Sequence, residues 1–331
     1  MMPILTATLS ISWAVSDASC ILVADASSTQ TLRIESWGHN AVRVRAVPAV
    51  GANAHFFDAP DVVSALVEPA SAPCVAKNAP ASLVQGNLNT SVGADGRITM
   101  TRISDRVVLL NELRTRTFGA SRNVATTSTS STGTPVAALD FHSLGLSFEA
   151  WEDERVYGLG QHKNGALNYK NETMRTFSLS PANTEILIPV YHSSRGYAFL
   201  LNLPGFGSVE LGDNETAWNV DAVLQADFWL ATTSAADSTA ADSSPWAQLQ
   251  YAYADATGHA PVYPEWTSGF WQCKNRYRNQ TQVLDIAQGY VDRDYPISLI
   301  IIDYKVFIFI FGYSTSPTTS SDLTLLRVVK F

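Results

Sequence analysis

The 331-residue sequence is poor in charged residues, which make up 16% of it, and its 22 Lys and Arg are outnumbered by 30 Asp and Glu. A net charge of −8 without a basic cluster lacks the electrostatic footprint of a nucleic-acid-binding protein, so we expect no nucleic-acid partner. Three cysteines, Cys20, Cys74 and Cys273, are too few and too dispersed for a disulfide framework or a Cys-x-x-Cys metal site. We expect unpaired thiols, and the odd count favours a reducing compartment.

A membrane-spanning segment is also missing. The apolar run over residues 297–311 is only 15 residues long and contains Asp303 and Lys305, whereas a span needs about 20 residues with few charges. The N-terminus has an apolar stretch without a preceding Lys or Arg, which makes it a poor signal peptide. We therefore expect no membrane partner and leave the compartment and the oligomeric state open.

Short strands dominate the sequence up to about residue 230. Leu32 and Ile34 alternate with polar residues, and after a Gly-His-Asn turn Val42 and Val44 alternate with Arg43 and Arg45, which predicts a hairpin with one buried face. Similar strands are expected at 97–103, 106–110, 196–201, 209–211 and 227–230. Many short strands without a helical stripe predict a β-sandwich, and the polar tracts 124–135 and 231–244 predict surface loops.

Near residue 245 the pattern becomes helical. Ser244 as N-cap, Pro245 at the first helical position and Gly258 after the last turn predict a helix over 245–258. A short strand at 268–272, an amphipathic helix from about 279 to 293 and a continuous apolar strand at 297–302 follow. An apolar strand without alternation is buried on both faces, as in parallel sheets, so residues 266–304 predict a β-α-β unit that opens a parallel sheet or barrel.

Four segments follow one another along the chain: ERVYGLGQHKNG at 154–165, a strand pair at 188–202, residues 253–266 and the β-α-β unit at 269–304. In this order they resemble glycoside hydrolase family 31, which includes α-glucosidases and α-xylosidases. Residues 269–304 resemble the first β-α-β unit of its catalytic barrel, and 154–165 its Tyr-Gly-Leu-Gly-Glu-type segment. Residues 188–202 resemble the strand pair that usually follows, and 253–266 the approach to the barrel. The resemblance, over about residues 30–304, implies a mainly β protein: an N-terminal mutarotase-like β-sandwich followed by the first β-α-β unit of a truncated (β/α)₈ barrel.

The same resemblance implies three substrate-binding residues and an α-linked glycoside as the partner. Asp303 aligns with the family carboxylate that binds a sugar hydroxyl in the −1 subsite, Tyr277 with an aromatic residue lining that pocket, and Tyr304 with the next wall position. Carboxylates accept charge-assisted hydrogen bonds from hydroxyls. The alternatives are a loop or capping role for Asp303 and a packed core tyrosine at 277. His162 and Arg195 are interpreted as structural residues of the sandwich.

No catalytic residue can be assigned. A retaining glycosidase needs two carboxyl groups about 5–5.5 Å apart, which the family takes from later barrel strands, and here only two barrel strands can be found. Asp292 and Asp294, at the end of the amphipathic helix, are interpreted as a solvated face. The sequence also has no His-Glu-x-x-His pattern and no dinucleotide fingerprint, so we expect neither metal nor cofactor.

The expected organisation is a sandwich over 1–230, a linker and connecting helix over 231–262, the start of the catalytic barrel over 263–304 and a non-family tail over 305–331. We expect the unfinished barrel to expose strand edges that have no pairing partner. Exposed edges of apolar strands promote aggregation. Three functions remain open: a fragment of a retaining α-glycosidase acting on α-xylosides or α-glucosides but inactive alone, a non-catalytic carbohydrate-binding β-sandwich, or a non-functional remnant of a gene.

Overall fold

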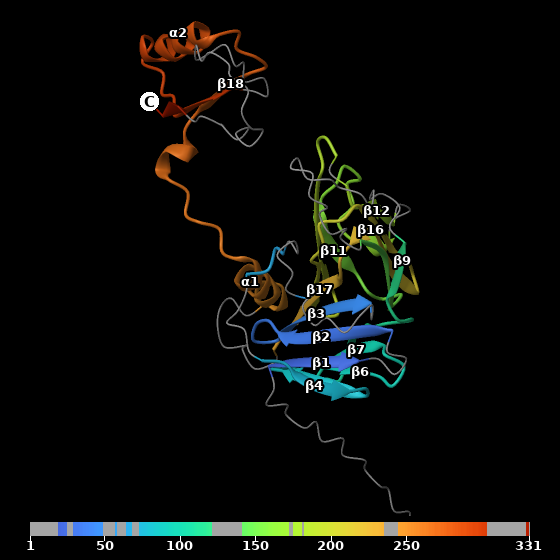
Figure 1. Cartoon of the computed structure of the whole chain (residues 1–331). Helices are drawn as coiled ribbons and strands as arrows, with labels where there is room; N and C mark the ends of the chain where they lie inside the picture. The colour runs from blue at the N-terminus through green and yellow to red at the C-terminus, as the bar shows by residue number, and fades with distance from the viewer. Residues whose placement is uncertain are drawn as a thin grey trace, which may run out of the picture. The chain divides into compact units, whose positions relative to one another are not determined.

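The structure, a computed structural model, divides into two compact units, Met1–His259 and Ala260–Phe331. It describes residues 19–24, 29–48, 57, 64–67, 73–120, 141–171, 175–180, 182–234, 244–302 and 329–330. Figure 1 gives the course of the chain. Within these residues, no helix has the length and apolarity needed to cross a bilayer.

The first unit is organised around a sheet of eight strands. Their order across the sheet is β11 (Val156–Gln161), β13 (Ile186–Ser193), β14 (Tyr197–Leu201), β17 (Ala226–Thr232), β3 (Ala41–Pro48), β2 (Gln30–Ser36), β1 (Cys20–Ala24) and β4 (Val75–Asn78). Neighbouring strands are antiparallel except for β1 and β4, which are parallel. This sheet is the layer of the sandwich on which the other sheets pack.

Two smaller sheets cover one face of the eight-stranded sheet. One contains β12 (Thr176–Ser178), β15 (Gly207–Leu211), β16 (Glu215–Val223), β10 (His142–Glu149) and β9 (Thr117–Ala120), and the other β5 (Ala81–Gln85), β6 (Leu88–Val92), β7 (Ile98–Arg102) and β8 (Val108–Asn111). Apolar side chains from all three sheets form one buried core. Phe199 of the large sheet, for example, stacks on Trp218 of the five-stranded sheet at 5.5 Å between ring centroids. The predicted β-sandwich is confirmed.

The β2–β3 hairpin shows how the period-two pattern builds this core. Its register pairs Ile34 with Val44, and both side chains are fully buried in the core. The hairpin is therefore as predicted, but the prediction of a single buried face is wrong. Arg43 and Arg45, which alternate with the apolar residues, are only 2% and 4% exposed, because the other face of the large sheet is covered as well.

A helix and short chain segments provide that second cover. Helix α1 (Pro245–Thr257) is capped by Ser244, whose Oγ accepts a hydrogen bond from the Ala247 N–H, and it ends at Gly258, whose positive φ of 93° suits glycine. Its Leu249 packs with Trp229 of β17 in a second buried cluster. The predicted helix is thus confirmed, and it belongs to the first unit, which runs to His259.

Cys20 and Cys74 form a disulfide with their Cα atoms 4.4 Å apart. The prediction of unpaired thiols is therefore wrong for these two residues, whereas Cys273 is free and exposed. The 54 residues that separate the partners in sequence hide the pairing, because it depends on the parallel alignment of β4 with β1. The disulfide removes the argument for a reducing compartment.

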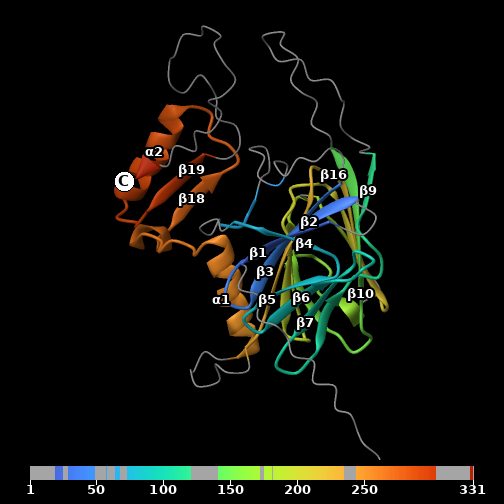
Figure 2. The same ribbon diagram turned by 60° about the horizontal axis from the view of Figure 1, so that its bottom comes forward.

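The second unit contains a parallel β-α-β unit, as predicted. After a 3₁₀ turn η3 (Glu265–Ser268), β18 (Trp271–Lys274) leads into α2 (Gln280–Val291) and β19 (Leu299–Ile302), which pairs with β18 in parallel register and with β20 (Val329–Lys330) in antiparallel register. The first strand begins later than predicted because the 3₁₀ turn occupies residue 268. Figure 2 shows α2 alongside the two parallel strands. The predicted loop 124–135 lies outside the described residues.

Candidate functional site

The carboxyl edge of β18 and β19 is where the sequence places the sugar site. The parallel register pairs Trp271 with Leu299 and Lys274 with Ile302, so the two strands end side by side. Active sites of (β/α)-barrel enzymes are built at this edge of the sheet. Asp303 and Tyr304 follow Ile302 directly in sequence and lie outside the described residues, so their place in a pocket remains a prediction.

Tyr277 lies in the loop between β18 and α2 and is fully buried. Its ring packs in a small cluster with Val283, Ala287 and Ile300. The phenol oxygen is 3.5 Å from Gln272 Nε2, a long contact, and burial raises the pKa of the Tyr277 hydroxyl. This position corresponds to the core tyrosine considered as the alternative, and a role in lining a sugar pocket stays a prediction.

The rest of this loop is exposed and basic. Lys274, Arg276 and Arg278 all have exposed side chains, and Arg278 is joined to the start of α2 through its N–H, which donates to Gln282 Oε1 at 2.7 Å. Asn279 caps α2 by accepting a hydrogen bond from the Gln282 N–H at 2.9 Å. Asp292 and Asp294 are exposed, as predicted for a solvated face.

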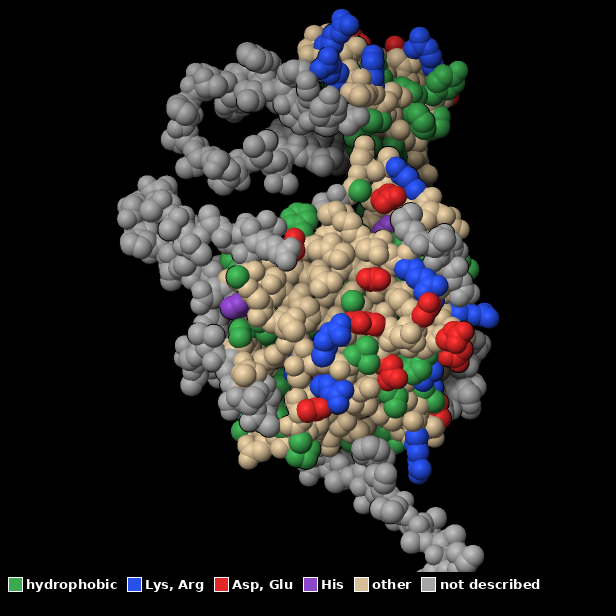
Figure 3. All heavy atoms as spheres, turned by 90° about the vertical axis from the view of Figure 1, so that its right-hand side faces the viewer, with side chains coloured by type: hydrophobic (Ala, Val, Ile, Leu, Met, Phe, Trp, Pro, Cys, Tyr) green, Lys and Arg blue, Asp and Glu red, His purple; other side chains and the backbone are tan. Residues whose placement is uncertain are grey.

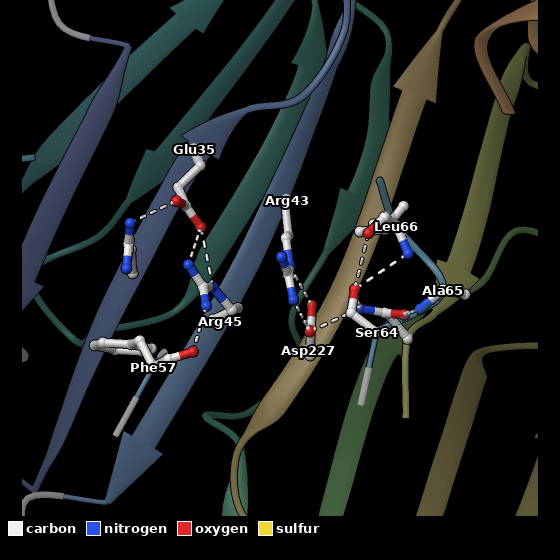
Figure 4. Close-up of polar contacts among 10 residues, drawn as sticks. Glu35, Arg43, Arg45, Phe57, Ser64, Ala65, Leu66 and Asp227 are labelled. Carbon is white, nitrogen blue, oxygen red and sulfur yellow. Dashed lines mark hydrogen bonds and ion pairs between the residues drawn. The ribbon is translucent and has the colours of Figure 1, made fainter. Parts of the chain in front are cut away.

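A buried ionic network on the large sheet is the polar centre that sequence reasoning missed (Figure 4). Arg43 and Asp227 form a two-pronged pair, with Nε–Oδ1 and Nη2–Oδ2 distances of 3.0 and 2.6 Å. Asn202 Nδ2 donates to the same carboxylate at 2.8 Å, and Asn202 Oδ1 accepts from the Ala65 N–H. Arg45 pairs with Glu35 differently, because its Nε and Nη2 both donate to the single oxygen Oε2, at 3.0 and 2.6 Å.

This network is structural rather than catalytic. Burial raises the pKa of Asp227, whereas the Arg43 guanidinium opposes that shift by favouring the carboxylate. The Asp227 side chain is fully buried and its oxygens are occupied by Arg43 and Asn202. A carboxylate with no access to solvent and with its oxygens already bonded cannot act as a nucleophile or general acid.

The Tyr-Gly-Leu-Gly segment of β11 is held by similar buried contacts. Glu154, just before this strand, accepts hydrogen bonds from Ser193 Oγ and Tyr197 Oη at 2.5 and 2.8 Å. His162 Nε2 lies 2.7 Å from the Leu159 carbonyl oxygen, and Arg195 Nη2 donates to the Val108 carbonyl at 3.0 Å. These contacts fit the structural interpretation of His162 and Arg195.

Metal ligands come together at one place in the described part of the chain, Cys20, Glu35 and Cys74. The disulfide between the two cysteines leaves neither sulfur as a thiolate, the form that binds metals. In Figure 3, basic and acidic side chains are interspersed among uncharged ones on one face of the first unit. Neither feature defines a cofactor site.

The fold places the chain in the class of proteins that join an antiparallel β-sandwich domain to a following (β/α)-type domain. Residues 260–319 match the Glycosyl hydrolases family 31 TIM-barrel domain. This match continues 15 residues beyond Tyr304 and so includes part of the segment for which we expected a non-family tail. The chain belongs to glycosyl hydrolase family 31.

Relatives of known sequence and structure agree with this family. The chain is 30% identical over 288 residues to an uncharacterized family 31 glucosidase of Pseudescherichia vulneris, covering 83% of this chain and 50% of the relative. It is 34% identical over 160 residues to α-xylosidase A of Aspergillus niger, covering 48% of this chain and 20% of the relative. A family 31 α-xylosidase from a soil metagenome, solved with xylose, matches with a TM-score of 0.60 and 30% identity over 87% of this chain and 41% of its own. The chain thus spans half or less of the length of these relatives.

Proposed function

We propose that this chain supplies the N-terminal β-sandwich and the first β-α-β unit of a retaining α-glycosidase acting on α-xylosides or α-glucosides. The observation that carries the proposal is the parallel β18–α2–β19 unit within the family match, because its carboxyl edge is the place where a barrel enzyme binds its substrate. The α-xylosidases among the relatives support the xyloside over other α-linked glycosides.

In this proposal Asp303 accepts a hydrogen bond from a sugar hydroxyl at the end of β19. An ionised carboxylate forms stronger hydrogen bonds with hydroxyl groups than a neutral acceptor does. Tyr304 and Tyr277 provide aromatic surface against the C–H face of the pyranose ring, which requires the Tyr277 ring to turn out of its cluster with Val283, Ala287 and Ile300. These three residues bind substrate and are not the catalytic pair.

We further propose that the 331 residues do not hydrolyse glycosides by themselves. Retaining hydrolysis requires two carboxyl groups about 5–5.5 Å apart at the sugar. In the described part of the second unit, the carboxyl groups are Glu265 in η3 and Asp285, Asp292 and Asp294 in α2 or the turn after it, and all are exposed. None of them lies on a strand end that faces a sugar site.

The test uses 4-nitrophenyl α-D-xyloside and α-D-glucoside. The purified 331-residue chain is expected to release no nitrophenol above the buffer rate. A chimaera joining residues 1–304 to the remaining barrel of the Aspergillus niger relative is expected to hydrolyse the xyloside. In that chimaera Asp303→Asn is expected to lower kcat/KM at least about 100-fold, the loss of about 3 kcal/mol of transition-state binding.

The exposed Asp292 provides the matched control. Asp292→Asn in the same chimaera is expected to leave kcat/KM unchanged, since its carboxylate is proposed to contact no substrate. Equal loss in both variants would show that the assay reports folding rather than sugar binding. Turnover by the purified 331-residue chain would contradict its proposed inactivity.

A further inference from the structure

A hollow of about 460 Å³ lies on the first unit, beside α1 and the edge strand β11. We name it the Trp246 hollow, and its described lining residues are Tyr157, Gly158, Leu167, His192, Trp246 and Gln250. Tyr157 and His192 are directly paired in the antiparallel register of β11 and β13, so their side chains point to the same face. The volume falls within the range of about 300–1,000 Å³ typical of small-molecule sites.

One wall of the Trp246 hollow is the exposed ring of Trp246, whose orientation is fixed by two neighbouring rings. The Trp246 ring lies 5.4 Å from the Tyr157 ring at an interplanar angle of 89°, and 6.4 Å from the His192 ring at 62°. Edge-to-face contacts of this kind fix the orientation of an indole, yet Trp246 remains 46% exposed. A rigid, exposed indole loses little conformational entropy when it binds a ligand, so this surface is suited to recognition.

Polar groups line the same hollow. His192 Nε2 is buried and makes no hydrogen bond within the described residues. Burial also lowers the pKa of His192, so its ring is neutral at pH 7. A buried nitrogen without a partner is unfavourable, and a ligand hydroxyl that bonds it removes this penalty. Gln250 lies one helical turn after Trp246 and adds an exposed amide.

We propose that the Trp246 hollow binds a neutral saccharide, whose apolar C–H face lies on Trp246 and one of whose hydroxyls bonds His192 Nε2. The described lining residues carry no charge, which disfavours phosphates and carboxylates as ligands. A purely apolar ligand would leave His192 Nε2 without a partner and desolvate the Gln250 amide. A pyranose ring combines an apolar face with several hydroxyls and satisfies both requirements.

This site binds and does not cleave. No carboxyl group is among its described lining residues, and glycoside hydrolysis requires two. The Trp246 hollow lies in the first unit, whereas the site proposed for hydrolysis lies at the end of β19 in the second. The two proposals can therefore fail independently, because one is measured by binding and the other by nitrophenol release.

The test is a calorimetric titration of the full 331-residue chain with D-xylose, maltotriose and isomaltotriose. We expect saturable binding of at least one of them with a Kd of about 1 mM, and about tenfold weaker binding after Trp246→Ala. His192→Phe keeps a ring of similar shape but removes Nε2, and it is expected to weaken binding severalfold. Gln250→Ala removes an exposed amide of the hollow without altering a buried atom, and it is also expected to weaken binding. Thermal unfolding of each variant checks that the sandwich is intact.

Tyr251 provides the matched control, because it is a neighbouring exposed aromatic residue of α1 that does not line the hollow. Tyr251→Ala is expected to leave the Kd unchanged. Inorganic phosphate is expected not to displace the bound sugar, because the described lining residues carry no charge, and displacement by phosphate overturns the preference for a neutral ligand. The absence of saturable binding by all three sugars, or binding unaffected by Trp246→Ala, His192→Phe and Gln250→Ala, also overturns the proposal.

Discussion

The two units are both built on apolar strands, but among the described residues only those of the first unit cover its strands on both sides. The eight-stranded sheet has two smaller sheets on one face and α1 on part of the other, and even its Arg43 and Arg45 are buried. In the described residues of the second unit one helix covers the parallel strands, and large apolar side chains are exposed. They are Val262, Tyr263, Phe270, Trp271, Leu284, Val291 and Tyr295.

This difference indicates that apolar strands alone do not give a sheet a stable core. The sheet also needs other elements packed on its faces. Ile300 of β19 is buried much as Val44 of β3 is, at 2% and 0% exposed. However, among the described residues Ile300 shares its buried cluster with three other buried side chains, those of Tyr277, Val283 and Ala287, whereas Val44 belongs to a core drawn from three sheets. We therefore expect the first unit to unfold in its own, more stable transition.

The largest effect is expected from Asp227→Ala. This change leaves the Arg43 guanidinium buried without the carboxylate that binds two of its nitrogens, and arginine cannot escape the cost by losing its proton. Breaking a buried ion pair from one side destabilises a protein by about 3–5 kcal/mol. Denaturant unfolding is expected to show this loss in the transition of the first unit alone.

The matched control for this prediction is the exposed pair of Asp95 and Arg97, whose side chains are 51% and 45% exposed. Asp95→Ala is expected to change the free energy of unfolding by less than about 0.5 kcal/mol, because solvent screens the pair. Comparable losses in both variants would mean that burial does not distinguish the two ion pairs.

The same arginines show what the sequence can and cannot predict about the fold. Alternation in β2 and β3 predicts the hairpin and the inward residues correctly, since the period of a strand is a local property. It does not reveal that Arg43 is buried against Asp227 and Asn202, because these residues lie more than 150 positions away in the chain. The Cys20–Cys74 disulfide is hidden for the same reason: it joins strands that are neighbours only in space.

The same distinction between local patterns and contacts of distant residues applies to the candidate site. The β-α-β unit and the capping role of Ser244 depend on local patterns and are found within a few residues of their expected positions, whereas the capping role of Asn279 was not predicted. Tyr277 was assigned from the resemblance, and only packing reveals that its ring is buried against α2. The Trp246 hollow has no sequence signal, because it depends on the pairing of β11 with β13.

The next largest effect is expected from reducing the disulfide of the first unit. Cys20→Ser with Cys74→Ser, or a reductant, is expected to lower the free energy of unfolding by about 2–4 kcal/mol, because the unfolded chain is freed from a closed loop. Cys273→Ser is the control, since that thiol is free and lies in the second unit. A count of three free thiols in the unfolded, unreduced protein would contradict the pairing.

A smaller effect is expected from the helix caps, which allow the two units to be compared directly. Ser244→Ala and Asn279→Ala each remove a side-chain acceptor for a first-turn N–H, at a typical cost of about 1 kcal/mol. Because α1 is packed on the large sheet, its cap loss is expected to lower the stability of the first unit as a whole. In α2 it is expected to appear as about fivefold faster amide exchange confined to the helix. Equal, global effects would show that the two units are equally cooperative.

The smallest effect on stability is expected where the second unit is uncovered. Leu284→Gln and Val291→Gln replace side chains that are 50% and 58% exposed on α2, and glutamine forms helices well, so unfolding is expected to change by less than about 0.5 kcal/mol. Light scattering on heating is expected to fall, because exposed apolar patches promote association. Val283→Gln is the contrasting variant, since that residue is buried against Tyr277. If Leu284→Gln proved as destabilising as Val283→Gln, this face of α2 would be covered in solution, and the contrast between a covered first unit and an uncovered second one would fail.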